Sequence, residues 1–210
     1  MISNALNIVI KELNRHLSDN YEEEDSGEKE LVKLGNLAEG FSSGGNNPRE
    51  MLYMSVVNIQ EEKTLKNLSC RSIDTMSFKV KHENPPVYIN LLILITAAHS
   101  EYINALSMLS RAIRFFQSQN FFTQENVAPD SITSTNAFIK DIEKLESFKL
   151  IFDLYSPTLE EVNHLWGTLG GKQYPFVLYK VRMLDLQFKA VQKEGGLVTE
   201  VISNFSHKEQ

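Results

Sequence analysis

Apolar residues recur every three or four positions in two long segments, the spacing that places them on one face of an α-helix. The spacing predicts a first helix over residues 2–17 and a second over 101–118. Ser3 and Ser100 lie at the starts of these segments, where a serine hydroxyl is a favoured N-cap. The predicted buried stripe of the second helix consists of Tyr102, Leu106, Leu109, Ile113 and Phe116.

A third, shorter helix is predicted from the signals at its two ends. Thr158 and Glu161 have the spacing of a capping box, in which each residue satisfies a free backbone N–H of the first turn. The helix is expected to continue to about Trp166 and to stop at Gly167. Two further glycines, at 170–171, predict a sharp turn before the next strand.

Between the helices, β-branched and aromatic runs predict strands. The predicted strands cover residues 31–37, 51–59, the vicinity of 78–81, 87–97, 148–155 and 176–186. The run VYINLLILITA is almost continuously apolar, which is typical of a strand buried on both faces, so we expect it at the centre of the sheet. The order of elements predicts an α+β fold, with a mixed, twisted sheet flanked by helices.

Four phenylalanines gather at the end of the second predicted helix, at 115, 116, 121 and 122. Core packing is the favoured interpretation. An assembly interface stays open as the alternative, because aromatic anchors concentrate binding energy at protein interfaces.

The length of 210 residues fits one large domain with an appendage. We expect a domain over 1–186 and a C-terminal extension over 187–210. The single cysteine, Cys70, excludes an internal disulfide and a multi-cysteine zinc site. The N-terminal segment lacks the apolar core of a signal peptide, and the longest apolar run, near 91–98, is far shorter than the roughly 20 residues that span a bilayer. These features favour a protein that folds in the cytoplasm without a membrane segment.

The net charge of −6 comes from one acidic stretch. Residues 19–30 hold seven acids and one base, and the rest of the chain balances 20 bases against 20 acids. Without a basic excess there is little to neutralise phosphates, which argues against a nucleic-acid partner. We interpret the acidic run as a solvated loop, with a cation site or a contact to a basic partner as the open alternative.

Catalytic motifs are missing from the sequence. There is neither a G-x-S-x-G elbow nor an H-E-x-x-H helix, and the glycines at 167–171 lack the spacing of a phosphate-binding loop. The histidines show no metal-ligand spacing, and no base can be placed beside Cys70. The residues therefore predict no metal, cofactor or small-molecule substrate. A small-ligand enzyme that uses Glu161, His164 and Lys172 remains an alternative hypothesis.

Four colinear blocks carry a family resemblance. They are VNIQEEKTLKN (57–67), NPPVYINLLILITA (84–97), YINALSMLSRAIRFFQSQNFFT (102–123) and LEEVNHLWGTLGGKQYPFVLYKVRML (159–184). Together they resemble the Pvc16-like family, which includes the cap, or tail-terminator, protein of extracellular contractile injection systems such as antifeeding-prophage particles. The resemblance extends over about residues 1–186.

The resemblance implies a non-enzymatic, phage tail-terminator-like protein. Its members form a ring, expected to be a hexamer, on the distal end of the inner tube. They also contact the last sheath layer and stop polymerisation. The implied partners are further copies of this chain, the inner tube protein and the sheath protein. The implied location is the cytoplasm during assembly, within a phage tail-like particle that some systems release from the cell.

We expect contacts to the tube or sheath at loops near 41–47 and 61–67, and at the extension, for which strand addition is a plausible mode. The candidate interface residues are Phe41, Asn46, Asn58, Glu61, Thr64, Asn67, Asn84, Pro85, Pro86, Trp166, Gly170, Gly171 and Arg182. Two other hypotheses keep the assembly role but change the position: a baseplate or tube-adaptor subunit, or a terminator in a type VI-like system.

Overall fold

The computed structural model describes residues 2–21, 30–41, 50–65, 71–74, 79–83, 87–132, 148–186, 191–196 and 202. Its helices are α1 (Ile2–Tyr21), α2 (Tyr102–Ser118), α3 (Pro129–Ile132) and α4 (Leu159–Thr168), with 3-10 turns η1 (Leu37–Glu39) and η2 (Lys63–Leu65). Its strands are β1 (Val32–Leu34), β2 (Met51–Glu61), β3 (Arg71–Asp74), β4 (Lys79–Glu83), β5 (Val87–Ala98), β6 (Phe121–Thr123), β7 (Lys149–Tyr155), β8 (Phe176–Leu186) and β9 (Val191–Gly196).

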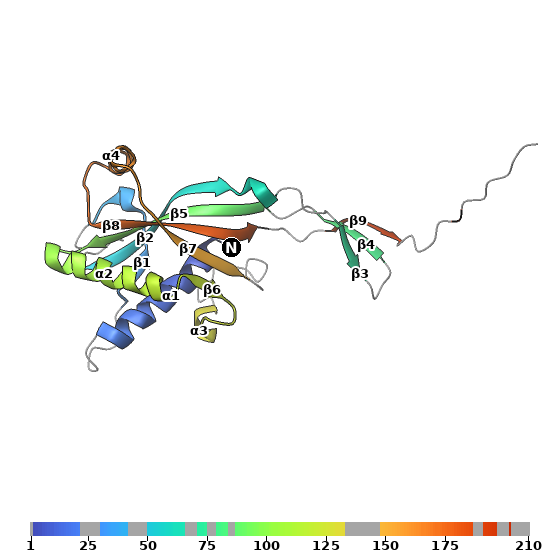
Figure 1. The fold of residues 1–210 in the computed structure, drawn as a ribbon, viewed down its shortest axis with the longest axis horizontal. Helices are drawn as coiled ribbons and strands as arrows, with labels where there is room; N and C mark the ends of the chain where they lie inside the picture. The colour runs from blue at the N-terminus through green and yellow to red at the C-terminus, as the bar shows by residue number, and fades with distance from the viewer. Residues whose placement is uncertain are drawn as a thin grey trace, which may run out of the picture.

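Six strands form the main sheet in the order β1-β2-β5-β8-β7-β6 (Figure 1). β1 runs parallel to β2, and the other neighbours are antiparallel. The predicted mixed sheet flanked by helices is therefore confirmed. β5 pairs with β2 from Ala98↔Met51 to Ile89↔Glu61, and with β8 on its other side. The prediction that the apolar run lies at the centre of the sheet is also correct.

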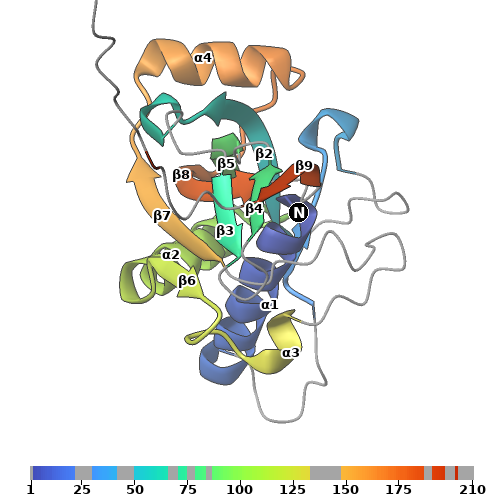
Figure 2. The ribbon, with the colours of Figure 1, turned by 90° about the vertical axis from the view of Figure 1, so that its right-hand side faces the viewer.

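The helices cover the two faces of this sheet unequally. α1 and α2 lie on one face and α4 lies on the other, as Figure 2 shows. Alternate residues of β5 follow this division: Ile93 and Ile95 belong to the core under α1 and α2, whereas Leu94 belongs to the smaller core beside α4. The run Leu91–Ile95 of β5 is continuously apolar and does not alternate, because both faces of the strand are covered there.

An aromatic cluster joins α2 to the strands beneath it. The ring centroid of Phe116 lies 4.9 Å from that of Phe152 and 4.6 Å from that of Tyr179. Burial raises the pKa of Tyr179 to about 12. Phe115 and Phe122 are also buried in this cluster, so the core interpretation is correct for them, whereas Phe121 is 47% exposed.

A second sheet of three antiparallel strands, β3-β4-β9, lies beyond the ends of β2, β5 and β8 (Figure 1). The strand predicted near 78–81 is confirmed as β4. β9, which lies within the predicted extension, pairs with β4 of the same chain. The domain boundary at 186 stays a prediction.

Several element ends differ from their predicted positions. α1 continues to Tyr21, and Ser3 lies inside its first turn rather than at its N-cap. At the start of α2 the N-cap is Glu101, while the hydroxyl of Ser100 donates to Glu50 at 3.3 Å. α4 passes through Gly167 and ends at Thr168. A Gly in the last turn costs a helix only about 1 kcal/mol, less than good packing supplies.

The strand predicted over 31–37 is limited to three residues, because β1 ends at Leu34 and Leu37 begins η1. β3, β6, β9 and the short helix α3 were not predicted from the sequence. β6 is three residues long and has no alternating pattern of its own, and it is held by pairing of Phe121, Phe122 and Thr123 with β7.

Candidate assembly surface

Three predicted interface residues meet beside α4. Phe41, Trp166 and Gly170 line one pocket of about 210 Å³, together with residues of η1, Lys172 and Tyr174. The ring centroid of Tyr174 lies 4.9 Å from that of Phe41 and 6.1 Å from that of Trp166. Segments that are more than 120 positions apart in the sequence thus form one small aromatic hollow.

Trp166 itself is 5% exposed, so it cannot be the accessible contact that the sequence suggested. Its indole packs edge-on against Phe176 of β8, with ring centroids 5.4 Å apart. Trp166 therefore anchors α4 on the sheet and forms the wall of the pocket. The partly buried Phe41 is the more accessible ring of the two.

The turn after α4 has the geometry that its glycines predict. Gly170 and Gly171 have φ angles of +95° and +77°, a region that side chains with a Cβ rarely adopt. The N–H of Gly171 donates to the carbonyl oxygen of Trp166 at 2.7 Å and closes the end of the helix. Crowding does not explain these glycines, since an added Cβ would meet no atom within 4 Å at either position. They are needed because the backbone turns with positive φ angles there.

Another group of predicted residues lies at the far end of β2. Asn58, Glu61 and Thr64 are exposed there, with a β-bulge between Val56 and Asn58. Sequence reasoning missed Glu62, which holds this end together. Its carboxylate accepts bonds from the hydroxyl of Thr64, from Asn90 of β5 at 2.8 Å, and from the backbone N–H of Thr64 at 3.2 Å.

The hydrogen bonds from Thr64 and Asn90 lower the pKa of Glu62 from 4.5 to about 2. A lowered pKa in the folded state means that the carboxylate stabilises the fold fully above about pH 4.5 and that this stabilisation is lost as the pH falls towards 2. We expect Glu62→Gln to be less stable than the wild type at neutral pH, with the difference narrowing over that acid range. Urea unfolding at a series of pH values measures the difference.

Thr64→Val is the companion variant, because it removes the hydroxyl donor and keeps the shape of the side chain. Without this hydrogen bond the folded-state pKa of Glu62 should lie closer to 4.5, so the acid-induced loss of stability should be smaller than in the wild type and should be complete at a higher pH. Stability curves for the wild type and Glu62→Gln that stay parallel between pH 4.5 and 2 would contradict the assigned role of Glu62.

Arg182, the last described candidate, pairs with Asp153 on the neighbouring strand β7, and both side chains are partly exposed. Asn46, Asn67, Asn84, Pro85 and Pro86 lie outside the described residues, as do Cys70 and most of the acidic run.

An exposed apolar stripe on α2 was not expected. Three of its four residues, Tyr102, Leu106 and Ile113, were predicted to be in the core, and that prediction is wrong. The stripe consists of Tyr102, Ile103, Leu106 and Ile113, and Ile103 is 77% exposed. α2 instead buries Ala105, Leu109, Ala112, Phe115 and Phe116. The small side chains of Ala105 and Ala112 allow that side of the helix to approach its neighbours closely.

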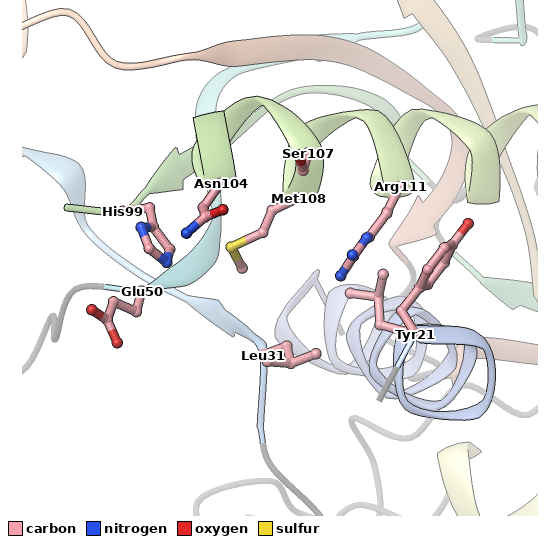
Figure 3. A pocket seen from close by; sticks show the side chains of 9 residues that line it. Tyr21, Leu31, Glu50, His99, Asn104, Ser107, Met108 and Arg111 are labelled. Atoms are coloured by element: carbon pink, nitrogen blue, oxygen red, sulfur yellow. The ribbon is translucent and has the colours of Figure 1, made fainter. Parts of the chain in front are cut away.

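A polar pocket of about 260 Å³ lies between α1 and α2, with Glu50, His99 and Asn104 among its lining residues (Figure 3). At one end of the pocket, the guanidinium of Arg111 lies over the ring of Tyr21, 4.5 Å from its centroid. This cation–π contact joins the two helices. Within the described part of the chain, no three His, Cys, Asp or Glu side chains are grouped as a metal site would require.

The three residues of the enzyme hypothesis have different neighbours. His164 is exposed and lies 3.8 Å from Glu160 on the surface of α4. Glu161 completes the capping box with Thr158 and accepts a bond from the hydroxyl of Tyr155 at 2.8 Å. The backbone bond from Thr158 is the main reason why the pKa of Glu161 is lowered. Lys172 lines the pocket beside Phe41. The capping box itself is confirmed.

None of the described helices is long and apolar enough to cross a membrane. The fold is similar to that of two solved proteins. One is the PVC sheath/tube terminator of an extracellular contractile injection system in its extended state, with a TM-score of 0.64 and 15% identity. The other is the anti-feeding prophage cap, described as the AFP tube terminating cap, with a TM-score of 0.53 and 14% identity.

The first similarity covers 100% of this chain and 64% of the terminator, and the second covers 94% of this chain and 60% of the cap. The chain thus spans less than two thirds of the length of either relative. No curated protein matches the sequence. The family described as the Pvc16 N-terminal domain matches residues 5–200, a range that includes β9. The chain therefore belongs to the Pvc16 N-terminal domain family.

Proposed function

We propose that the chain is a structural cap of a contractile injection system. It forms a ring, expected to hold six copies, on the distal end of the inner tube, contacts the terminal sheath layer and stops polymerisation. The observation that carries the proposal is the match to the Pvc16 N-terminal domain family. It is supported by two solved proteins of similar fold, which are described as a sheath/tube terminator and a tube terminating cap. The partners are the tube protein, the sheath protein and further copies of this chain.

The physical demands on such a cap suit this molecule. A terminator must imitate a tube subunit on one side and offer the next ring no matching surface on the other. Equivalent weak contacts around a ring add up, so no single contact needs to be strong. The exposed end of β2, with Asn58, Glu61 and Thr64, is our candidate for one contact. The hollow around Phe41 and the extension over 187–210 are two others.

A structural role also agrees with the positions of Glu161, His164 and Lys172. Each of these residues contacts a different neighbour, so they are not arranged as one catalytic group. The particle would be assembled in the cytoplasm and belong to an extracellular injection system. A baseplate or tube-adaptor subunit of the same kind of particle is the second candidate, because this role also needs a ring that matches the tube.

Deletion of the gene tests the proposal. Cells without the protein should assemble tubes and sheaths of variable length with open distal ends, and re-expression of the wild-type chain should restore one length. Electron microscopy of purified particles measures the length, and an antibody to the chain marks its position. Uniform, closed particles in the deletion strain would contradict the cap role. A label at the baseplate end would favour the second candidate.

A further inference from the structure

The exposed stripe of α2 has a positive rim. Arg111 and Arg114 are the only charged residues between Tyr102 and Ser118. Arg111 is engaged with Tyr21, whereas Arg114 is exposed. At 3.6 residues per turn, Arg114 lies about three turns beyond Ile103 on the same side of the helix, at the edge of the stripe. α2 therefore offers large apolar side chains next to a cation, a composition that is typical of the centre and rim of a protein interface.

α4 has the opposite character. Leu159, its first residue, is 78% exposed. Glu160 and Glu161 are the acidic residues of the helix, and α4 contains no Lys or Arg. Glu161 is used by the capping box, whereas Glu160 has only the exposed His164 nearby, at 3.8 Å, among the described residues, and 85% of its side chain is exposed. The start of α4 thus combines an exposed leucine with a negative charge.

These two surfaces lie on opposite faces of the main sheet, with α4 on one face and α2 on the other (Figure 2). A pair of different, complementary patches joins copies head to tail, and such contacts generate a ring when the rotation between copies closes. A twofold dimer would instead need one patch that matches itself. The placement and the charges of α2 and α4 therefore favour repeated contacts between copies.

We propose that the stripe of α2 packs against the first turn of α4 in a second copy of this chain, with Arg114 facing Glu160 across the contact. The contact itself is argued from α2 and α4 alone. Only the conclusion that this contact builds the ring rests on the proposed cap function. Burial of Leu159 against Ile113, the stripe residue at the level of Arg114 on the helix, supplies apolar area, and the charge pair selects the orientation and the partner surface.

A charge exchange tests the contact. Arg114→Glu and Glu160→Arg should each weaken self-association by about tenfold or more, because each places like charges opposite one another. An equimolar mixture of the two variants should associate nearly as well as the wild type. When the two variants alternate in the assembly, residue 114 of one copy always faces a residue of opposite charge at position 160 of the next. Half of these contacts are Arg114 with Glu160, and the other half have the two charges exchanged. Sedimentation velocity across a concentration series measures both effects.

Glu125→Arg, an exposed reversal in the turn after β6, is the matched control and should leave association unchanged. Circular dichroism checks that the variants fold. A wild-type chain that stays monomeric at its highest soluble concentration would overturn the proposed contact, as would a mixture no better than its components.

Expression of each variant in the deletion strain separates this inference from the cap proposal. If Arg114→Glu restores a uniform tube length as well as the wild type does, the contact is wrong and the cap role stands. If deletion itself leaves the tube length uniform, the cap role fails, and sedimentation still decides whether α2 and α4 meet between copies.

Discussion

Replacing Phe116 by alanine lowers the free energy of unfolding by about 3–5 kcal/mol, the usual cost of emptying a large aromatic site in a core. Phe116 is buried, and its ring contacts Phe115, Phe122, Phe152 and Tyr179. This cluster holds α2 against β7 and β8, so the cavity cannot close without moving the helix. Urea unfolding followed by circular dichroism measures the loss.

Phe121→Ala is the matched control, since Phe121 is the exposed member of the same phenylalanine group at 47% exposure. Its cost should stay below about 1 kcal/mol, as for most surface substitutions. Equal losses for the two variants would show that the aromatic cluster is not the core of this part of the fold.

The second large effect is expected at Trp166. Trp166→Ala should lower the free energy of unfolding by about 3 kcal/mol, at the low end of the range for large aromatic residues. The indole packs against Phe176 and Tyr174, but its buried Nε1 has no hydrogen-bond partner among the residues that the structure describes. Removing an unsatisfied donor recovers part of what the lost packing costs.

Trp166→Phe separates the effect of lost packing from the effect of removing the unsatisfied Nε1–H donor, because it keeps an aromatic ring on the sheet and lacks the donor. We expect a much smaller loss for this variant than for Trp166→Ala. Leu159→Ala, at the exposed start of the same helix, should leave stability nearly unchanged. Urea unfolding followed by circular dichroism suits all three variants, because the two that replace Trp166 lose the only tryptophan and with it the fluorescence signal. A Trp166→Ala variant as stable as Leu159→Ala would mean that Trp166 does not anchor α4.

The positions of α1, α2 and α4 along the chain were predictable, but the orientation of α2 was not. Periodicity correctly placed a helix over 101–118 and placed Leu109 and Phe116 in the core. It could not separate the apolar residues that pack against the sheet from Tyr102, Leu106 and Ile113, because the apolar arc of this helix is wider than the sector that the fold covers. Which apolar sector is covered depends on where α1 and the strands lie.

The candidate site shows the same division. Glycines at 170–171 predicted a turn from local backbone preference alone, and the structure confirms it. The convergence of Phe41 and Trp166 on one pocket has no local signal, since η1 and α4 are brought together only because both pack on the same face of the sheet. Glu62 was missed because its partner Asn90 lies on another strand, 28 positions away in the sequence.

By itself the sequence determined the three longer helices, the main strands other than β6, the central strand, the capping box and the family, because these depend on local propensity, on periodicity and on residue order. The tertiary structure alone decided which faces stay uncovered. Apolar side chains are buried wherever another element reaches them, and the distance between elements is a property of the whole sheet. The exposed stripe of α2 and the acidic start of α4 became visible as complementary surfaces only when the sheet placed them on its opposite faces.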